Sequence, residues 1–332
     1  MNDFFSDLNI KYEASKKTDW TGRKTNPEIG NQYWYQDIEC HNINDLENKN
    51  YPNFGLIGYA CDEGVRRNFG RIGAKDGPKE IRKRLAKLPS HYGSKRIVDY
   101  GDVVCINKDM EACQQAFSKS ISHLISNKVF PIAIGGGHDI AYAHFIGIRD
   151  AFKNAGKRIG IINFDAHFDL RPVDDLPNSG TPFNQIISEL KLEKEALDYF
   201  AIGIQKQSNT KALFEKASQE SVDFVFNTDC RDSNDSIKAI KRKLQKVIDA
   251  NDYVYITIDM DGFSSAYASG VSAPSPLGFS PLFIFEMLDF LLKTNKVVSF
   301  DIAEFNPKYD VDGQTAALAS KLVEYIVTNI SI

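Results

Sequence analysis

The chain has 332 residues, of which 42% are hydrophobic and 25% charged, and a formal net charge of −4 at pH 7. This composition excludes disorder over the whole length, and without a basic stripe the sequence does not suggest a nucleic-acid partner. A chain of this size can bury enough apolar surface to fold without disulfide bonds or structural metal ions.

Neither a membrane nor an oxidising compartment is indicated. Five scattered cysteines form no CxxC pair, and the N-terminus lacks the basic start and apolar run of a signal peptide. No apolar stretch approaches the roughly 20 residues of a membrane span. We therefore expect a cytoplasmic protein without a disulfide framework.

Residues 1–50 are polar and aromatic without clear periodicity, and we interpret them as an N-terminal extension. From there on, short runs rich in Ile, Val and Phe alternate with amphipathic stretches. Unbroken apolar runs of this length predict strands that are buried on both faces. The eight runs are 54–60, 96–104, 129–134, 158–164, 199–204, 222–226, 253–258 and 297–302.

Helical patterns separate most of these runs. In residues 108–127 the apolar side chains recur at three-to-four spacing, and Ser280-Pro281 is an N-cap followed by a first-turn proline. Further helices are predicted over 77–88, 140–154, 235–250, 280–295 and 316–330. The alternation predicts parallel βαβ units in one α/β domain over residues 51–332. Ligands of such sheets bind beyond the carboxyl ends of the strands.

The first polar segment at a predicted strand end is Gly135-Gly136-Gly137-His138-Asp139. Three glycines let the backbone turn tightly and approach another group closely. The segment lacks the GxGxxG spacing and the lysine of a phosphate loop. Taken alone, it is better interpreted as a glycine-rich turn with a capping histidine or aspartate than as a site.

The second segment, 165–169, follows the apolar run 158–164. Because side chains alternate faces in an extended chain, Asp165, His167 and Asp169 would point the same way. Two carboxylates and an imidazole on one face form a poor core and a good metal site. The alternative, a solvent-facing edge strand, does not suit the buried run before it.

The third segment is Asp259-Met260-Asp261, again two carboxylates after an apolar run. A lone DxD is a weak signal, since turns and calcium loops also contain it. Together the three segments are stronger, because four carboxylates at one sheet edge would repel one another and raise their pKa values. Two divalent cations would offset that charge.

The ligand types indicate which metal and which chemistry to expect. Mixed His and Asp ligation suits Mn, Fe, Co or Zn, absent thiolates argue against structural zinc, and carboxylate-rich ligation favours Mn. In a two-metal site a bridging water loses a proton near neutral pH and becomes the nucleophile. The pattern thus indicates hydrolysis without a covalent enzyme intermediate.

These motifs, in this order, resemble the arginase/agmatinase/formimidoylglutamase (ureohydrolase) family over about residues 53–330. The resemblance rests on Gly135–His138, the DAHxD motif at 165–169, the DxD motif at 259–261 with Pro274 to Gly278 behind it, and Glu304-Phe305-Asn306-Pro307. It implies a three-layer α/β/α sandwich with a mainly parallel eight-stranded sheet, in agreement with the eight apolar runs.

The resemblance also implies a role for each motif residue. One manganese ion would be held by His138, Asp165, Asp169 and Asp259, and the other by Asp165, His167, Asp259 and Asp261. Asp165 and Asp259 would therefore bridge the two ions. Asp169 would also orient the bridging hydroxide and pass its proton to the departing amine, and Glu304 would hold the amidine nitrogens.

Within the family, the chain is more similar to the formimidoylglutamases, which convert N-formimidoyl-L-glutamate and water to L-glutamate and formamide. The segments that look like their signatures are 61–68, 70–78, 135–142 and 180–183, and arginases usually carry Asp where Gly137 stands. No histidine follows His167, so the loop histidine thought to shuttle protons in arginase and agmatinase has no counterpart.

A substrate with two carboxylates needs cationic or amide partners. Arg66, together with Arg67 and Arg71, follows the first strand and could reach the mouth of the site. Further candidate substrate contacts are Asn178, Ser179 and Asn209. The alternative for the arginines is ion pairing within the fold or a subunit contact.

Two other functions stay open. One is an arginase or agmatinase, which would release urea from a guanidine. The other is a catalytically silent relative that serves as a binding protein, although such a protein has no need of six intact metal-ligand positions. We expect a small-molecule substrate, and neither a nucleic acid nor a membrane as partner. The protein could also assemble as a homo-oligomer.

Overall fold

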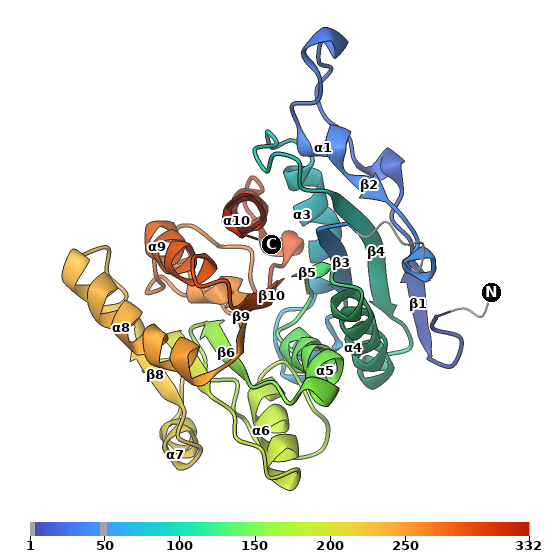
Figure 1. Cartoon of the computed structure of the whole chain (residues 1–332). Helices are drawn as coiled ribbons and strands as arrows, with labels where there is room; N and C mark the ends of the chain where they lie inside the picture. Colours follow the sequence, from blue (N-terminus) through green and yellow to red (C-terminus); the bar gives the residue numbers. More distant parts are fainter. Residues whose placement is uncertain (1–3, 47–51, 332) are drawn as a thin grey trace.

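The structure, a computed structural model, describes residues 4–46 and 52–331. One sheet runs through the molecule in the strand order β1-β4-β3-β5-β10-β9-β6-β7-β8, with β2 paired to β4 (Figure 1). All pairings in the described part of the chain are parallel except that of β1 with β4. The eight apolar runs correspond to β3 Phe54–Ala60, β4 Ile97–Cys105, β5 Phe130–Ile134, β6 Ile159–Phe164, β7 Tyr199–Ile204, β8 Asp223–Phe226, β9 Tyr253–Asp259 and β10 Val297–Ala303.

Helices cover both faces of the sheet, which gives the expected three layers. One face packs against α3 Gly77–Leu85, α8 Asn234–Ala250, α9 Pro281–Leu292 and α10 Gln314–Asn329. The other packs against α4 Met110–Ser126, α5 Ile140–Phe152, α6 Pro182–Leu192 and α7 Lys211–Gln219. None of the described helices is long and apolar enough to cross a bilayer.

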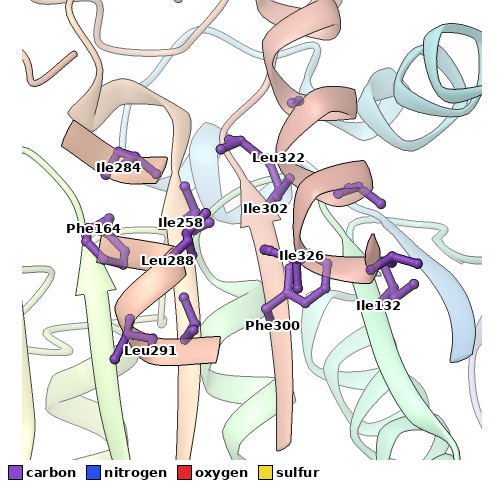
Figure 2. Packing of buried hydrophobic residues seen from close by; sticks show 14 of the residues in the cluster. Ile132, Phe164, Ile258, Ile284, Leu288, Leu291, Phe300, Ile302, Leu322 and Ile326 are labelled. Carbon is purple, nitrogen blue, oxygen red and sulfur yellow. The ribbon is translucent and has the colours of Figure 1, made fainter. Parts of the chain in front are cut away.

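The buried runs form the strands because apolar side chains are needed on both faces of a covered sheet. Figure 2 shows Ile258 and Ile302, from neighbouring strands, in one cluster with Leu288 of α9 and Leu322 of α10. These four side chains are fully buried. Each contributes roughly 1.5–3 kcal/mol by leaving water, so the core holds the central strands, and hence their carboxyl ends, in fixed positions.

Over the described residues the sheet has ten strands, two more than the eight expected, and both additions come from the predicted N-terminal extension. β1 Ile10–Glu13 pairs antiparallel with β4, and β2 Glu39–Cys40 pairs with its other end. Trp34, in the short helix α1 Trp34–Asp37, is fully buried. The described part of this segment therefore belongs to the same sheet and core as the rest of the chain.

Candidate metal centre

The three polar segments meet at the carboxyl ends of β5, β6 and β9, which lie with β10 in the middle of the sheet (Figure 1). Two groups of side chains bring ligand atoms to within 4.8 Å of one another, so that each group could hold a metal ion. The first group is His138, Asp165, Asp169 and Asp259, and the second is Asp165, His167 and Asp261. Asp165 belongs to both, which is the arrangement that two neighbouring cations require.

His138 is the centre of the first group. Its Nδ1 atom lies 3.1 Å from an oxygen of Asp165, 2.9 Å from one of Asp169 and 3.1 Å from one of Asp259. The imidazole is only 1% exposed. Three carboxylates around one buried nitrogen atom form a cation site rather than a hydrophobic core.

His167 is the centre of the second group, with its Nδ1 atom 3.2 Å from Asp261 and 3.4 Å from Asp165. The loops after β6 and β9 bring these residues together, and in each loop an aspartate side chain accepts a hydrogen bond from the backbone two residues further on. Asp165 accepts a hydrogen bond from the backbone N–H of His167 at 2.7 Å, and Asp259 accepts one from that of Asp261 at 2.7 Å. Each turn follows directly on a buried strand.

The convergence of Asp165, His167 and Asp169 has a different cause from the one expected. The strand β6 ends at Phe164, so the alternation of an extended chain does not continue through the motif. Asp169 instead has a left-handed φ of 47°, which costs a non-glycine residue free energy, about 1–3 kcal/mol where the conformation is strained. This turn directs its carboxylate back onto His138.

Glu304, just after β10, is the second left-handed residue at the site, with φ 62°. Its Oε1 atom accepts a hydrogen bond from the backbone N–H of His138 at 2.9 Å, while the buried Oε2 atom has no partner among the described residues. Burial, with the nearby charge of Asp261, raises the pKa of Glu304 to about 8. A buried oxygen without a donor is free to accept a hydrogen bond from a ligand.

The protonation states show how strongly the site needs positive charge. Burial, reinforced by Asp261 and Asp165, raises the pKa of Asp259 well above its ordinary value. Although burial disfavours the imidazolium, the surrounding carboxylates hold the pKa values of His138 and His167 well above their ordinary values. The two imidazoles thus carry protons that divalent cations would displace.

The donor set fits a pair of divalent cations. Four carboxylates carry four negative charges, which two divalent ions would balance with both imidazoles neutral. Within the part of the chain that the structure describes, the buried Oδ1 atom of Asp261 has no hydrogen-bond partner and is available as a ligand. With oxygen and nitrogen donors and no thiolate, the set suits a metal such as manganese.

A cavity of about 300 Å³ opens above the cluster. Its described lining includes His167, Asp169, Asp259, Asp261 and Glu304 from the cluster, and Asn68, Arg71, Arg171, Ser179 and Asn209 among the others. A larger hollow of about 720 Å³ lies over α4 and α5 and contains none of the cluster residues. The smaller cavity is therefore the one that chemistry at the cluster would use.

The four predicted substrate contacts are not all at this cavity. Ser179 and Asn209 line it. Asn209, however, uses its amide within the fold, since it accepts from Phe168 N and donates to Ala166 O and Gln205 O. This side chain shapes the wall rather than offering free hydrogen-bonding groups.

Arg66 and Asn178 do not belong to the described lining of the cavity. Glu63 binds the Arg66 guanidinium through both of its oxygens, with Nε 2.6 Å from Oε2. Asn178 accepts a hydrogen bond from the backbone N–H of Gly180 at 2.9 Å and so closes its own loop. For Arg66 the geometry supports the alternative of ion pairing within the fold.

The sequence predictions did not include Arg171, which lines the cavity. Its position two residues after the DAHxD motif is the feature of the sequence that could have indicated it.

Fold and cluster together define a class of protein: an α/β sandwich that gathers imidazoles and carboxylates at its strand ends for two divalent cations. The Arginase family model matches residues 52–328. The chain belongs to the arginase family.

Its relatives include formimidoylglutamases of nearly the same length. The protein of that name from Legionella pneumophila (strain Lens) is 40% identical over 98% of this chain and 100% of its own. That of Clostridium tetani is 37% identical over 98% of both chains. The crystal structure of Trypanosoma cruzi formiminoglutamase with Mn²⁺ has a TM-score of 0.74 and 24% identity, and the match covers 87% of this chain and 98% of that one.

Proposed function

We propose that the protein is a binuclear manganese hydrolase that converts N-formimidoyl-L-glutamate and water to L-glutamate and formamide. The observation that carries the proposal is the convergence of six side chains on two overlapping cation sites at the base of one cavity. Near-full-length relatives named formimidoylglutamase support this substrate. The Mn²⁺ in the T. cruzi structure supports the choice of metal.

The six ligand positions would divide as the family resemblance implies. His138, Asp165, Asp169 and Asp259 would hold one ion, and Asp165, His167, Asp259 and Asp261 the other. Manganese, when bound, would lower the pKa of a water molecule and supply the positive charge that hydrolysis of the amidine requires. The reaction joins the water oxygen to the amidine carbon, and the bond from that carbon to the glutamate nitrogen breaks.

Asp169 is suited to carry the proton that this exchange moves. Its carboxylate lines the cavity, and burial together with Asp165 raises its pKa above the ordinary value. The Oδ2 atom contacts His138, which leaves Oδ1 to accept a proton from water and deliver it to the departing amine nitrogen. This path needs no histidine beyond His167.

Glu304 is suited to hold the amidine. Its Oε2 atom is buried at the cavity and lacks a partner in residues 4–46 and 52–331, so it would accept a charge-assisted hydrogen bond from an amidinium N–H. The cationic amidinium would in turn favour the ionised carboxylate, which burial and the nearby charge of Asp261 disfavour by raising the pKa of Glu304. Substrate and Glu304 thus complement each other in charge.

The test is turnover by the manganese-reconstituted protein of four substrates side by side: formimidoylglutamate, arginine, agmatine and a guanidino acid. We expect formamide and glutamate from the first and little urea from the others. Urea from arginine or agmatine would replace this proposal with the arginase or agmatinase alternative. No turnover of any amidine or guanidine by a protein with two bound metal ions would favour the silent binding protein.

The cellular setting follows from the same proposal. We place the reaction in histidine degradation, in the cytoplasm, and the five free thiols agree with a reducing compartment. A homo-oligomer also stays a prediction, which light scattering of the purified protein would test.

A further inference from the structure

Three of the five cysteines gather at the carboxyl ends of β3 and β4. Cys61 directly follows β3, Cys105 is the last residue of β4, and Cys113 lies in the first turn of α4. The two strands are neighbours, and the parallel register that pairs Ala60 with Val104 places Cys61 beside Cys105. Since α4 packs against both strands (Figure 1), the third cysteine lies over the same place.

The three side chains form one cluster of thiols. Each thiol forms side-chain hydrogen bonds with the other two, and the Cys113 sulfur also lies 3.9 Å from the backbone oxygen of Val103 on β4. Cys40, which is half-buried like Cys105, packs instead against the core on the opposite face of the sheet. It therefore serves as a matched control for the reactivity of the cluster.

Cys105 is the member of the cluster that a dissolved reagent can reach, because it is half-buried while Cys61 and Cys113 are fully buried. Hydrogen bonds from the Cys113 and Cys61 thiols lower the pKa of Cys105 well below its ordinary value, although burial and the charge of Asp139 oppose its ionisation. Burial raises the pKa of Cys113, so this thiol keeps its proton. The thiolate is the nucleophilic form of cysteine. The cluster thus joins an accessible thiolate to a protonated thiol.

From this arrangement we infer that Cys105 is a site of oxidation by hydrogen peroxide, with a disulfide bond to Cys113 as the product. The Cys105 thiolate attacks one peroxide oxygen, the O–O bond breaks, and hydroxide leaves a sulfenic acid behind. The Cys113 sulfur then attacks that of Cys105, the S–O bond breaks, and the departing hydroxide takes the Cys113 proton. Two thiols are oxidised by two electrons, and the peroxide is reduced to water. The inference does not depend on the substrate of the enzyme.

The thiol cluster is joined to the turn that carries His138. The backbone oxygen of Cys61 accepts a hydrogen bond from Gly137 N–H at 3.0 Å, and Gln114, the neighbour of Cys113, donates to the backbone oxygen of Asp139 at 3.0 Å. A disulfide requires a sulfur–sulfur distance of about 2.05 Å, so its formation draws the start of α4 toward β4. We expect this movement to weaken manganese binding about 10- to 100-fold, as loss of a contact that orients a metal ligand does.

Peptide mapping tests the disulfide directly. The manganese-loaded protein is treated with excess hydrogen peroxide, its remaining thiols are alkylated, and trypsin cleaves after Lys108, between the two cysteines. Mass spectrometry should find the two peptides joined with the loss of two hydrogen atoms. The link should be absent from Cys105→Ser and present in Cys40→Ser. A wild type that forms no link, or that joins Cys105 to Cys61 instead, would overturn the inference.

The reactivity of Cys105 is measurable without any variant. Its alkylation rate in the native protein should hardly change between pH 6 and pH 8, whereas a thiol with an ordinary pKa near 8.5 speeds up by more than about fiftyfold over this range. Cys40, whose pKa is raised by burial, should follow the second pattern. Equal pH profiles for the two cysteines would contradict an accessible thiolate at Cys105.

Calorimetric titration with Mn²⁺ tests the connection to the metal centre. Metal-free wild type that has been oxidised should bind manganese about 10- to 100-fold more weakly than the reduced protein, and dithiothreitol should restore the affinity. Oxidised Cys105→Ser should bind like its own reduced form, which excludes damage elsewhere in the chain. Equal affinities for reduced and disulfide-bonded wild type would show that the bond does not reach the metal centre.

Discussion

The Nε2 atom of His138 lies 3.0 Å from the hydroxyl oxygen of Thr257 on β9. That hydroxyl donates its one hydrogen to Asp301 at 2.6 Å, because a carboxylate can only accept. Thr257 must therefore accept from His138, which places the imidazole hydrogen on Nε2. The Nδ1 atom, which faces Asp165, Asp169 and Asp259, is then the one that would bind a metal ion in exchange for its proton.

Asp301 is itself held by hydrogen bonds to buried side chains further from the metal ligands. Its other oxygen accepts from Tyr255 and lies 2.7 Å from Nδ1 of His144. His144 also contacts Ser299, and all of these side chains are buried. His144 therefore lies in the buried core and also supports Asp301, which accepts the hydrogen bond of Thr257 behind the metal-ligand candidate His138.

Replacing Thr257 by valine tests this connection. The change keeps the shape of the side chain but removes the acceptor for His138 and the donor to Asp301. We expect manganese affinity to fall about 10- to 100-fold, as for other groups that orient a metal ligand. Calorimetric titration of the metal-free protein measures this, and Thr257→Ser, which restores the hydroxyl, is the matched control. Equal affinities for valine and wild type would contradict the role.

Glu304→Gln tests the amidine contact. Glutamine can still accept the hydrogen bond from the His138 backbone but lacks the negative charge that would hold an amidinium. We expect kcat/KM to fall by at least tenfold with the manganese content unchanged, since a charge-assisted hydrogen bond contributes about 1.5–3 kcal/mol. Steady-state kinetics and metal analysis on the same sample measure kcat/KM and the manganese content. Unchanged kinetics would place the amidine elsewhere.

Removal of the metal should destabilise the fold. Without cations, buried carboxylates such as Asp165 and Asp259 lie close together and depend on two imidazolium protons for balance. Metal binding stabilises by mass action, about 4 kcal/mol at a thousandfold excess over Kd. We expect calorimetry to show a clear drop in Tm after chelation and its recovery on adding Mn²⁺. The same Tm with and without metal would show that the cluster does not bind it.

The ion pair of Glu39 with Arg96 predicts a pH effect away from the site. The Nε atom of Arg96 lies 2.5 Å from the carboxylate, and its hydrogen bond lowers the pKa of Glu39 from 4.5 to about 2. Because the folded pKa is depressed, the stabilisation is present above pH 4.5 and is lost as pH falls toward 2. Glu39 is 37% exposed, so solvent screening limits the contribution to about 1 kcal/mol. Denaturant unfolding should show Glu39→Gln less stable than wild type at pH 7, with the difference shrinking below about pH 4.5; a constant difference would argue against the pair.

Sequence predicts the central strands well for a physical reason. A parallel strand covered on both faces, such as β3 or β7, is apolar throughout, so its ends can be placed closely. The edge strands lack that signal: β1, with the sequence IKYE, is only half-buried, and β2 has two residues. The helix α6 is absent from the predicted elements, although Thr181-Pro182 places a threonine and a first-turn proline where a helix can begin.

The candidate metal ligands could be predicted because carboxylates that follow buried apolar runs are costly to bury unless a cation balances them. Which of the arginines lines the cavity could not be predicted from the sequence. Arg66, Arg71 and Arg171 all lie near strand ends in sequence, and which one is neutralised depends on contacts such as that with Glu63 or with the Tyr309 ring. Only the folded arrangement shows that Arg71 and Arg171, but not Arg66, belong to the described lining of the cavity.

The most direct test of the paired cation site is X-ray diffraction from crystals of the manganese-loaded protein, recorded at the manganese absorption edge. Two separate anomalous peaks should appear, one among the ligand atoms of His138, Asp169 and Asp259, the other between His167 and Asp261, with Asp165 touching both. A single peak, or none, in crystals grown with excess Mn²⁺ would contradict a binuclear centre.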